Sequence, residues 1–185
     1  MNIKKTTEYR DDDKAMFYSY DIGETHHMWF TQELNSGNIY SVSIVRNQRD
    51  FREVNIYSRN VDNHTYFPTH FTASIPGNEC SAEEMPAWIA LLREAQDVMQ
   101  AVTEFFAKSE QYRFYCKRHV EREMDRVDLG NYELDGVEFT DDDIDNMTVI
   151  MFNAHAMDAK DIVHEYLVGI REVLDAGLED EHEEL

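Results

Sequence analysis

The chain has 185 residues, 42% hydrophobic and 12% aromatic, a composition that excludes a disordered acidic protein and predicts a packed core. Its 17 basic and 38 acidic side chains give a formal net charge of −21. No run of about 18 apolar residues is present and no apolar segment follows the N-terminal lysines, so neither a membrane span nor a secretory signal is predicted. Cys80 and Cys116 lie far apart, which is typical of reduced thiols in a cytoplasmic protein.

The first 77 residues are rich in Tyr, Phe, Val, Ile and Thr, and several segments alternate apolar with polar side chains, as β-strands do. Turn residues such as Asn35–Asn38 separate these segments. Short connections between consecutive strands favour an antiparallel meander of about five strands. The predicted strands are Ala15–Ile22, Met28–Leu34, Asn38–Arg46, Phe51–Ser58 and Tyr66–Ile75.

A long helix is predicted after the sheet. Ser81 and Glu84 form a capping-box pair at its start, although Pro86 shifts the expected beginning of the regular part toward the proline itself. The helix is expected to continue to about Arg126, with a kink near Lys108–Glu110. Apolar side chains recur every three or four positions and are expected to pack on the sheet: Trp88, Leu92, Ala95, Met99, Val102 and Phe106.

The remaining residues are predicted to be mainly helical. Asp135 and Gly136, flanked by alternating residues, predict a short hairpin over Asn131–Phe139. Thr140 and the three aspartates after it are typical of a helix N-terminus, and Met147–Phe152 fits either a helix or a buried strand. Asp158 is expected to cap a final helix that ends near Ala176. We therefore expect an α+β protein in which residues 1–126 form the sheet and long helix, and residues 127–185 an acidic region, within one compact domain or two.

The negative charge is concentrated at one end of the chain. Residues 127–185 carry 18 acidic and 2 basic side chains, a net of −16, whereas residues 1–126 carry a net of −5. Such asymmetry indicates a charged partner. On the final helix the acids form a stripe with a carboxylate about every 5 Å, a coarse copy of a phosphate backbone. The expected partner-binding residues are Asp141, Asp142, Asp143, Asp145, Asp158, Asp161, Glu165, Glu172, Asp175 and Glu179.

Two other interpretations of the acidic residues stay open. The first is an ordinary solvated face. The second involves the basic residues at the end of the long helix, Arg113, Lys117, Arg118, Arg122 and Arg126. These are spaced for salt bridges within their own helix, but they could instead cover the acidic region, within the chain or across a homodimer.

Support for catalysis is thin. The sequence has no Gly-rich phosphate loop and no G-x-S-x-G motif. His155, Asp158, Asp161 and His164, beside Glu165, have helical spacing, so a metal-dependent hydrolase is an alternative, but a helix break at Asp158 would separate the histidines. No metal, cofactor or catalytic residue is therefore expected. His26 and His27 would point to opposite faces of a strand.

The predicted sheet offers a weaker nucleic-acid site. Arginines flank strands that carry aromatic residues, a combination that can stack single-stranded bases. The residues concerned are Arg46, Arg49, Arg52 and Arg59, with Tyr40, Tyr57, Tyr66 and Phe67. Because the whole chain would repel phosphate, direct nucleic-acid binding is not expected.

By size, acidity and the concentration of charge in Asp141–Glu184, the chain resembles the small acidic inhibitors that mobile elements carry against host DNA-targeting systems, such as anti-restriction and anti-CRISPR proteins. The resemblance rests on these bulk properties and on no motif. It implies a non-catalytic protein that occupies the DNA site of a basic nuclease. One alternative is an immunity protein or antitoxin against a basic toxin, and another is an assembly protein that self-associates through its Trp88–Phe106 stripe.

Overall fold

The computed structural model describes residues 1–47, 54–58, 71–74, 81–154 and 158–183, with side chains at all of these except 41, 55–58, 71–74 and 177–183. The chain divides into two compact units, Met1–Tyr115 and Cys116–Leu185. The division falls within the helix α2 (Glu110–Met124), which contributes residues to both units.

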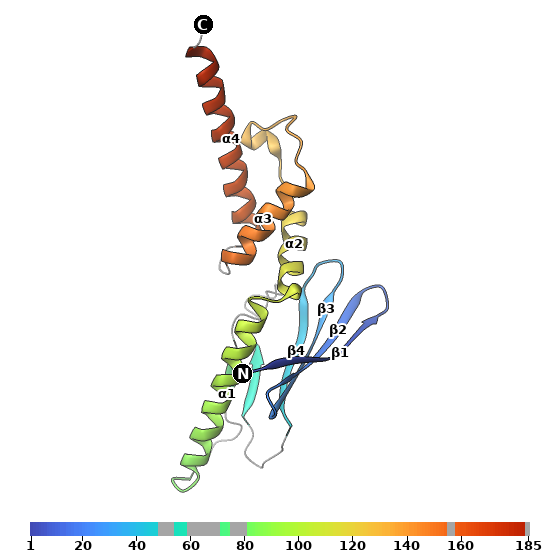
Figure 1. Cartoon of the computed structure of the whole chain (residues 1–185), viewed down its shortest axis with the longest axis vertical. Coiled ribbons are helices and arrows are strands. Elements are labelled where there is room, and N and C mark those ends of the chain that lie inside the picture. The colour runs from blue at the N-terminus through green and yellow to red at the C-terminus, as the bar shows by residue number, and fades with distance from the viewer. Residues whose placement is uncertain (48–53, 59–70, 75–80, 155–157, 184–185) are drawn as a thin grey trace. The chain divides into compact units, whose positions relative to one another are not determined.

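The first unit is built on a six-stranded sheet in which neighbours in the chain pair side by side and antiparallel (Figure 1). This confirms the predicted antiparallel meander and the α+β class. The strands are β1 (Ile3–Asp11), β2 (Ala15–Ile22), β3 (His26–Glu33), β4 (Ile39–Arg46), β5 (Asn55–Ser58) and β6 (Phe71–Ser74). Of the last two predicted strands, Val54 is described but lies outside β5, and the remaining residues lie outside the described part of the chain.

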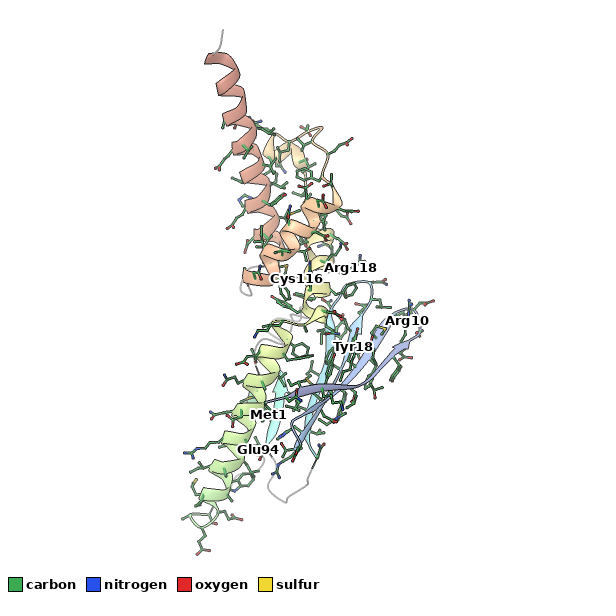
Figure 2. The ribbon with its side chains drawn as sticks, viewed as in Figure 1. Met1, Arg10, Tyr18, Glu94, Cys116 and Arg118 are labelled. Carbon is green, nitrogen blue, oxygen red and sulfur yellow. The ribbon has the colours of Figure 1, made fainter. Side chains whose placement is uncertain are left out.

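The sequence pattern does not predict β1. This strand lies at one edge of the sheet, and its residues from Lys4 to Asp11 are all exposed. Neither of its faces is buried, so its sequence carries no alternation of apolar and polar side chains. Its lysines and acids are typical of an edge strand that resists pairing with other chains. Arg10 lies near its end, beside the turn to β2 (Figure 2).

One face of β2 and β3 packs against α1 (Met85–Phe106). Met28 and Phe30 of β3 are completely buried. The Phe30 ring lies 5.1 Å from that of Phe106, and the rings of Tyr20 and Phe105 are 4.8 Å apart. The predicted apolar stripe therefore faces the sheet, as expected. Its buried members are Trp88, Ala95, Val102 and Phe106, and Val98 is buried with them.

The start of α1 agrees with the sequence. The helix begins at Met85 with Pro86 in its first turn, where a missing N–H costs nothing. The capping-box pair forms just before it: the Glu84 N–H donates to Ser81 Oγ at 3.3 Å, and the Ser81 N–H donates to the Glu84 carboxylate at 3.4 Å.

The long helix predicted to continue to about Arg126 is two helices, α1 and α2, interrupted at residues 107–109. Ser109 causes the interruption. Its hydroxyl donates to the Phe106 carbonyl at 2.9 Å and accepts the Tyr112 N–H at 3.1 Å, so it ends one helix and caps the next. The break lies where the sequence predicts only a kink, because a serine fits a helix interior as well as a cap when judged by spacing alone.

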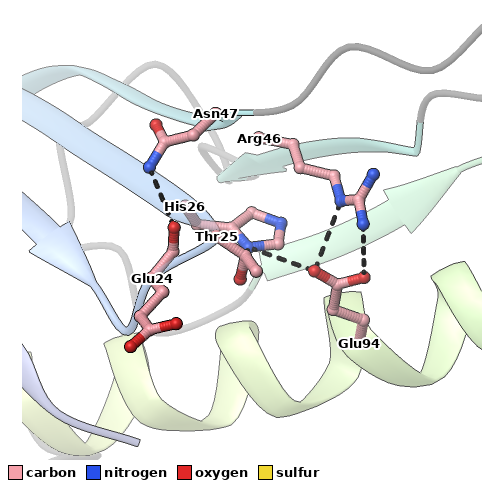
Figure 3. Close-up of polar contacts among 6 residues, drawn as sticks. All are labelled: Glu24, Thr25, His26, Arg46, Asn47 and Glu94. Atoms are coloured by element: carbon pink, nitrogen blue, oxygen red, sulfur yellow. Dashed lines mark hydrogen bonds and ion pairs between the residues drawn. The ribbon is translucent and has the colours of Figure 1, made fainter.

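A polar cluster joins α1 to the sheet (Figure 3). Glu94 of α1 accepts two hydrogen bonds from the guanidinium of Arg46, both at 3.3 Å, and one of its oxygens lies 3.7 Å from Nδ1 of His26. His26 is 4% exposed, and burial lowers its pKa, although the Glu94 charge opposes that shift. The imidazole is therefore neutral near pH 7, and its Nδ1 lies 2.9 Å from the Thr25 hydroxyl.

Removing the Glu94 carboxylate should destabilise the first unit. Glu94→Ala leaves Arg46 as a half-buried charge without this carboxylate, so we expect the free energy of unfolding to fall by about 2 kcal/mol. Urea denaturation followed by circular dichroism would measure the change. Arg93→Ala, an exposed substitution on the same helix, serves as the control and should cost less than about 0.5 kcal/mol. Equal effects of the two substitutions would contradict this role for Glu94.

The second unit contains the rest of α2, a short 3-10 helix η1 (Leu129–Tyr132), α3 (Asp141–Ala154) and α4 (Ala159–Glu183). Helix α4 packs against α3 and η1 (Figure 1). The core of the second unit includes Leu134, Met147, Ile162 and Leu167. Cys116 of α2 is also buried, and Arg118 follows it on that helix (Figure 2). None of the helices in the described ranges combines the length and apolar character that crossing a membrane requires.

The hairpin predicted over Asn131–Phe139 is wrong, because η1 and turns occupy this segment. Gly136 has the positive φ, 85°, that the Asp-Gly signal predicts, but no strands pair beside it. Glu133 adopts a left-handed conformation that ends η1, and the Leu134 side chain is buried. The ambiguous segment Met147–Phe152 is helical and lies within α3.

Candidate protein-binding surface

The acidic residues at the start of α3 have two different roles. Asp143 accepts hydrogen bonds from the backbone N–H and the hydroxyl of Thr140, both at 2.8 Å, and so completes a capping box. Its second oxygen accepts the Tyr166 hydroxyl of α4, also at 2.8 Å. These bonds, led by the one from the Thr140 backbone, lower the pKa of Asp143. Asp141 and Asp142 are exposed in the same first turn.

Asp143→Ala should therefore destabilise the second unit by about 1 kcal/mol near neutral pH. A lowered folded-state pKa means that the contribution is complete above pH 3.8, the ordinary value, and is lost as the pH falls through the folded-state pKa. Urea unfolding at several pH values should show the difference from wild type shrinking in acid. Asp142→Ala, in the same turn, should cost only about 0.3–0.5 kcal/mol. Equal costs would contradict the capping role.

Asp158 is also a helix cap. Its carboxylate accepts the backbone N–H of Asp161 at 3.0 Å, at the first turn of α4. The predicted cap is confirmed, and this carboxylate is already used within the chain. Along the same helix, Asp161, Glu165 and Glu172 are exposed. Glu179 lies on the helix too, but its side chain is outside the described part.

Two more of the predicted acids form ion pairs. Asp145 accepts a hydrogen bond of 2.9 Å from Nζ of Lys117 in α2. This bond is the main cause of the raised pKa of Lys117. Asp175 lies 2.8 Å from the guanidinium of Arg171, which also contacts Glu133 at 2.9 Å. Arg171 thus ties the η1 segment to α4. Each of the two cations thus joins segments that are distant in the sequence.

The arginines of α2 in this unit are mostly bonded within their own helix. Arg118 contacts Glu121 at 2.6 Å, and Arg126 contacts Glu123 at 3.3 Å. Arg122 lies 2.7 Å from Nδ1 of His119, whose pKa burial lowers to about 4. The sequence left open whether this basic set covers the acidic region. In the structure Lys117 contacts Asp145 of α3, and Arg113 is exposed.

Five of the ten predicted acids have exposed side chains with no hydrogen bond or ion pair among the described residues. We call them the acidic surface: Asp141, Asp142, Asp161, Glu165 and Glu172. They belong to a unit with 21 acidic and 6 basic side chains, a net of −15. Within the described part of this unit, five of the basic side chains contact a carboxylate. The surface therefore presents a negative field that the described cations of this unit do not neutralise.

Apolar side chains are also exposed on helix α4, beside members of the acidic surface. Val163 and Leu167 of α4 are buried, but Leu174, on the same face of the helix as Leu167, is 42% exposed. Val173 beside it is 70% exposed. Val168, which lies between Glu165 and Glu172 on the acid stripe, is 37% exposed. The C-terminal part of α4 therefore carries exposed apolar side chains beside exposed carboxylates.

The structure adds no support for the metal site or for the base-stacking site considered from the sequence. His164 of the possible metal set lies 2.9 Å from the Tyr132 hydroxyl, and His155 is outside the described residues. No group of three or more metal-binding side chains occurs in the described ranges. Of the sheet residues proposed for base stacking, Arg46 is bonded to Glu94 and Tyr40 is 38% exposed. The side chains of the others, from Arg49 to Phe67, lie outside the described part.

Sequence reasoning missed a chain of hydrogen bonds on the face of the sheet opposite α1. It links Asp21, His27, Ser19 and Thr6, from three neighbouring strands. As predicted, His26 and His27 point to opposite faces. The alternation of side chains in β2 and β3 would have placed Ser19, Asp21 and His27 on one face of the sheet if the register of the hairpin had been known. Thr6 could not have been placed, because it lies in β1, which the sequence pattern does not predict.

Comparison with known proteins shows no family model, no curated protein and no solved structure that matches this chain.

Proposed function

We propose that this chain is an acidic inhibitor that binds a basic nucleic-acid-binding protein, such as a CRISPR effector nuclease or a restriction enzyme, and blocks its DNA site. The acidic surface supports this proposal. Its five carboxylates are exposed, and no cation in the described part of the chain contacts them. Binding and blocking need no catalysis, cofactor or metal, and we place the protein in the cytoplasm with its target.

Electrostatics explains how such a surface would act. A unit with a net charge of −15 attracts a basic cleft over roughly a Debye length, about 8–10 Å at physiological salt. Steering of this kind raises association rates by 10- to about 10³-fold. Each arginine or lysine that normally contacts a phosphate can contact a carboxylate instead. The inhibitor would therefore compete with DNA for the same cations.

Charge alone does not select one basic protein over another. Exposed apolar side chains beside the carboxylates can supply that selectivity, because buried anchors at the centre of an interface carry most of the binding energy. Val168, Val173 and Leu174 are available on α4 for this purpose. A second copy of the chain is a poor partner for this surface, because it would bring like charges together.

The direct experiment tests purified nucleases one by one. Binding of labelled duplex DNA is followed by fluorescence anisotropy, with increasing amounts of this protein, at low and high salt. Inhibition of a guide-loaded CRISPR effector or a restriction enzyme, weakened by salt, is the expected result. Protection from a toxin nuclease alone would indicate an immunity protein instead. Unchanged DNA binding by all of them would contradict the proposal.

A further inference from the structure

The first unit contains a second arrangement with its own chemistry, on the sheet face opposite α1. Asp21 Oδ1 lies 2.9 Å from Nδ1 of His27, and Nε2 of the same ring lies 2.8 Å from Ser19 Oγ. A carboxylate only accepts hydrogen bonds, so Nδ1 carries the proton and Nε2 presents its lone pair to the serine hydroxyl. Carboxylate, imidazole and hydroxyl are thus bonded in the order that activates a serine nucleophile.

The sheet register explains why these three side chains meet. Asp21 and His27 are directly opposite each other in the β2–β3 pair, and Ser19 is two residues before Asp21 on the same face. The β1–β2 pair shifts register between Lys5 and Thr7, which makes Thr6 the extra residue of a β-bulge. A bulge redirects its side chain, and here the Thr6 hydroxyl lies 2.9 Å from Ser19 Oγ.

The surroundings are partly open and partly aromatic. The side chains of Asp21 and His27 are 47% and 28% exposed, whereas Ser19 is 6% exposed. Thr6, whose hydroxyl is bonded to Ser19 Oγ, is itself exposed on the edge strand. The rings of Tyr9 and Phe17 lie 5.0 Å apart on this side of the sheet, and Trp29 is directly opposite Ser19.

We propose that Ser19 is a nucleophile activated by His27 and oriented through Asp21, and that it takes acyl groups from small esters with an apolar acyl or aryl part. Ser19 Oγ attacks the carbonyl carbon while its proton passes to His27 Nε2. The bond to the leaving oxygen then breaks, and that oxygen takes the proton from His27. Water attacks the acyl-Ser19 ester with His27 accepting its proton, the bond to Oγ breaks, and the serine recovers its hydrogen.

The other groups have defined roles in these steps. Asp21 is a positioning residue, because it fixes the tautomer and stabilises the imidazolium that forms. The Thr6 hydroxyl, released from Ser19, can donate to the oxygen of the tetrahedral intermediate, as an oxyanion donor does. The aromatic rings offer an apolar surface to the acyl or aryl group. The site is separate from the acidic surface and does not depend on the proposed inhibition.

An alkyl fluorophosphonate tests the nucleophile without a known substrate. The full-length protein is incubated with the reagent, and mass spectrometry locates the phosphonylated residue. We expect modification at Ser19, with loss of fluoride, at a rate at least about 10²-fold above that of Ser43, which lies on the neighbouring strand opposite Trp29. His27→Gln should lower the rate by about 10²- to 10⁴-fold, and Asp21→Asn should lower it too. Ser43→Ala, the matched control, should leave it unchanged.

A chromogenic ester, p-nitrophenyl butyrate, provides the second measurement. A burst of p-nitrophenol equal to one per chain is expected, and Ser19→Ala should abolish it while keeping the wild-type circular dichroism spectrum. The proposal is overturned if Ser19 is not modified, if His27→Gln reacts at the wild-type rate, or if Ser19→Ala retains the burst.

Discussion

Replacing Phe30 by alanine is expected to lower the free energy of unfolding of the first unit by about 3–5 kcal/mol. Phe30 is completely buried at the centre of the face that α1 covers. Its ring lies 5.1 Å from the ring of Tyr18, 5.8 Å from that of Tyr20 and 5.1 Å from that of Phe106. Truncation would leave a cavity between strand and helix that neighbouring side chains fill only in part.

Urea denaturation monitored by tryptophan fluorescence and circular dichroism would measure this loss. Val45→Ala, on the neighbouring strand β4 and 42% exposed, is the control and should cost less than about 1 kcal/mol. A Phe30→Ala variant as stable as this control would show that α1 does not pack on β3 as described.

Converting the acidic surface to amides is expected to have the largest effect on partner binding. The variant carries Asn at 141, 142 and 161 and Gln at 165 and 172. Removing five charges, each worth about 0.5 kcal/mol against a basic partner, should lower the affinity at low salt by about 10²-fold. Most of that loss should be in the association rate, because exposed charges act mainly through steering. Surface plasmon resonance against an inhibited nuclease would measure both quantities.

The matched control changes net charge equally but elsewhere. It replaces five exposed acids of the first unit by amides: Asp11, Asp12, Glu24, Glu83 and Asp97. If only total charge mattered, the two variants would bind equally well. We expect the control to bind within about threefold of the wild type, because the proposed contacts with the partner are made by the acidic surface and not by these five residues.

Much of the first unit could be predicted from the sequence, since buried faces impose a period on it. The alternation in β3 and the spacing from Trp88 to Phe106 both arise because one face of each element meets the core. Strand β1 has no buried face, so its sequence shows no alternation of apolar and polar side chains. The break at Ser109 depends on two hydrogen bonds of a single hydroxyl, which spacing does not encode.

The candidate surface was only partly predictable. Sequence identifies acids on one stripe and the cap at Asp158, but it does not show that Asp143 accepts the Tyr166 hydroxyl or that Arg171 approaches Glu133. Both contacts join helix α4 to segments distant in the sequence, so they depend on tertiary geometry. The chain of bonds from Asp21 to Thr6 was not predicted at all, because it requires the register of three strands and the position of a bulge.

The proposed inhibition depends on carboxylates of the second unit replacing phosphates in a basic cleft. Displacement of labelled duplex DNA from an inhibited nuclease, measured by anisotropy with the wild type and the two five-amide variants, tests this most directly. We predict that the wild type and the first-unit control displace DNA at similar concentrations, and that the acidic-surface variant needs about 10²-fold more. Equal potency of all three proteins would contradict the account.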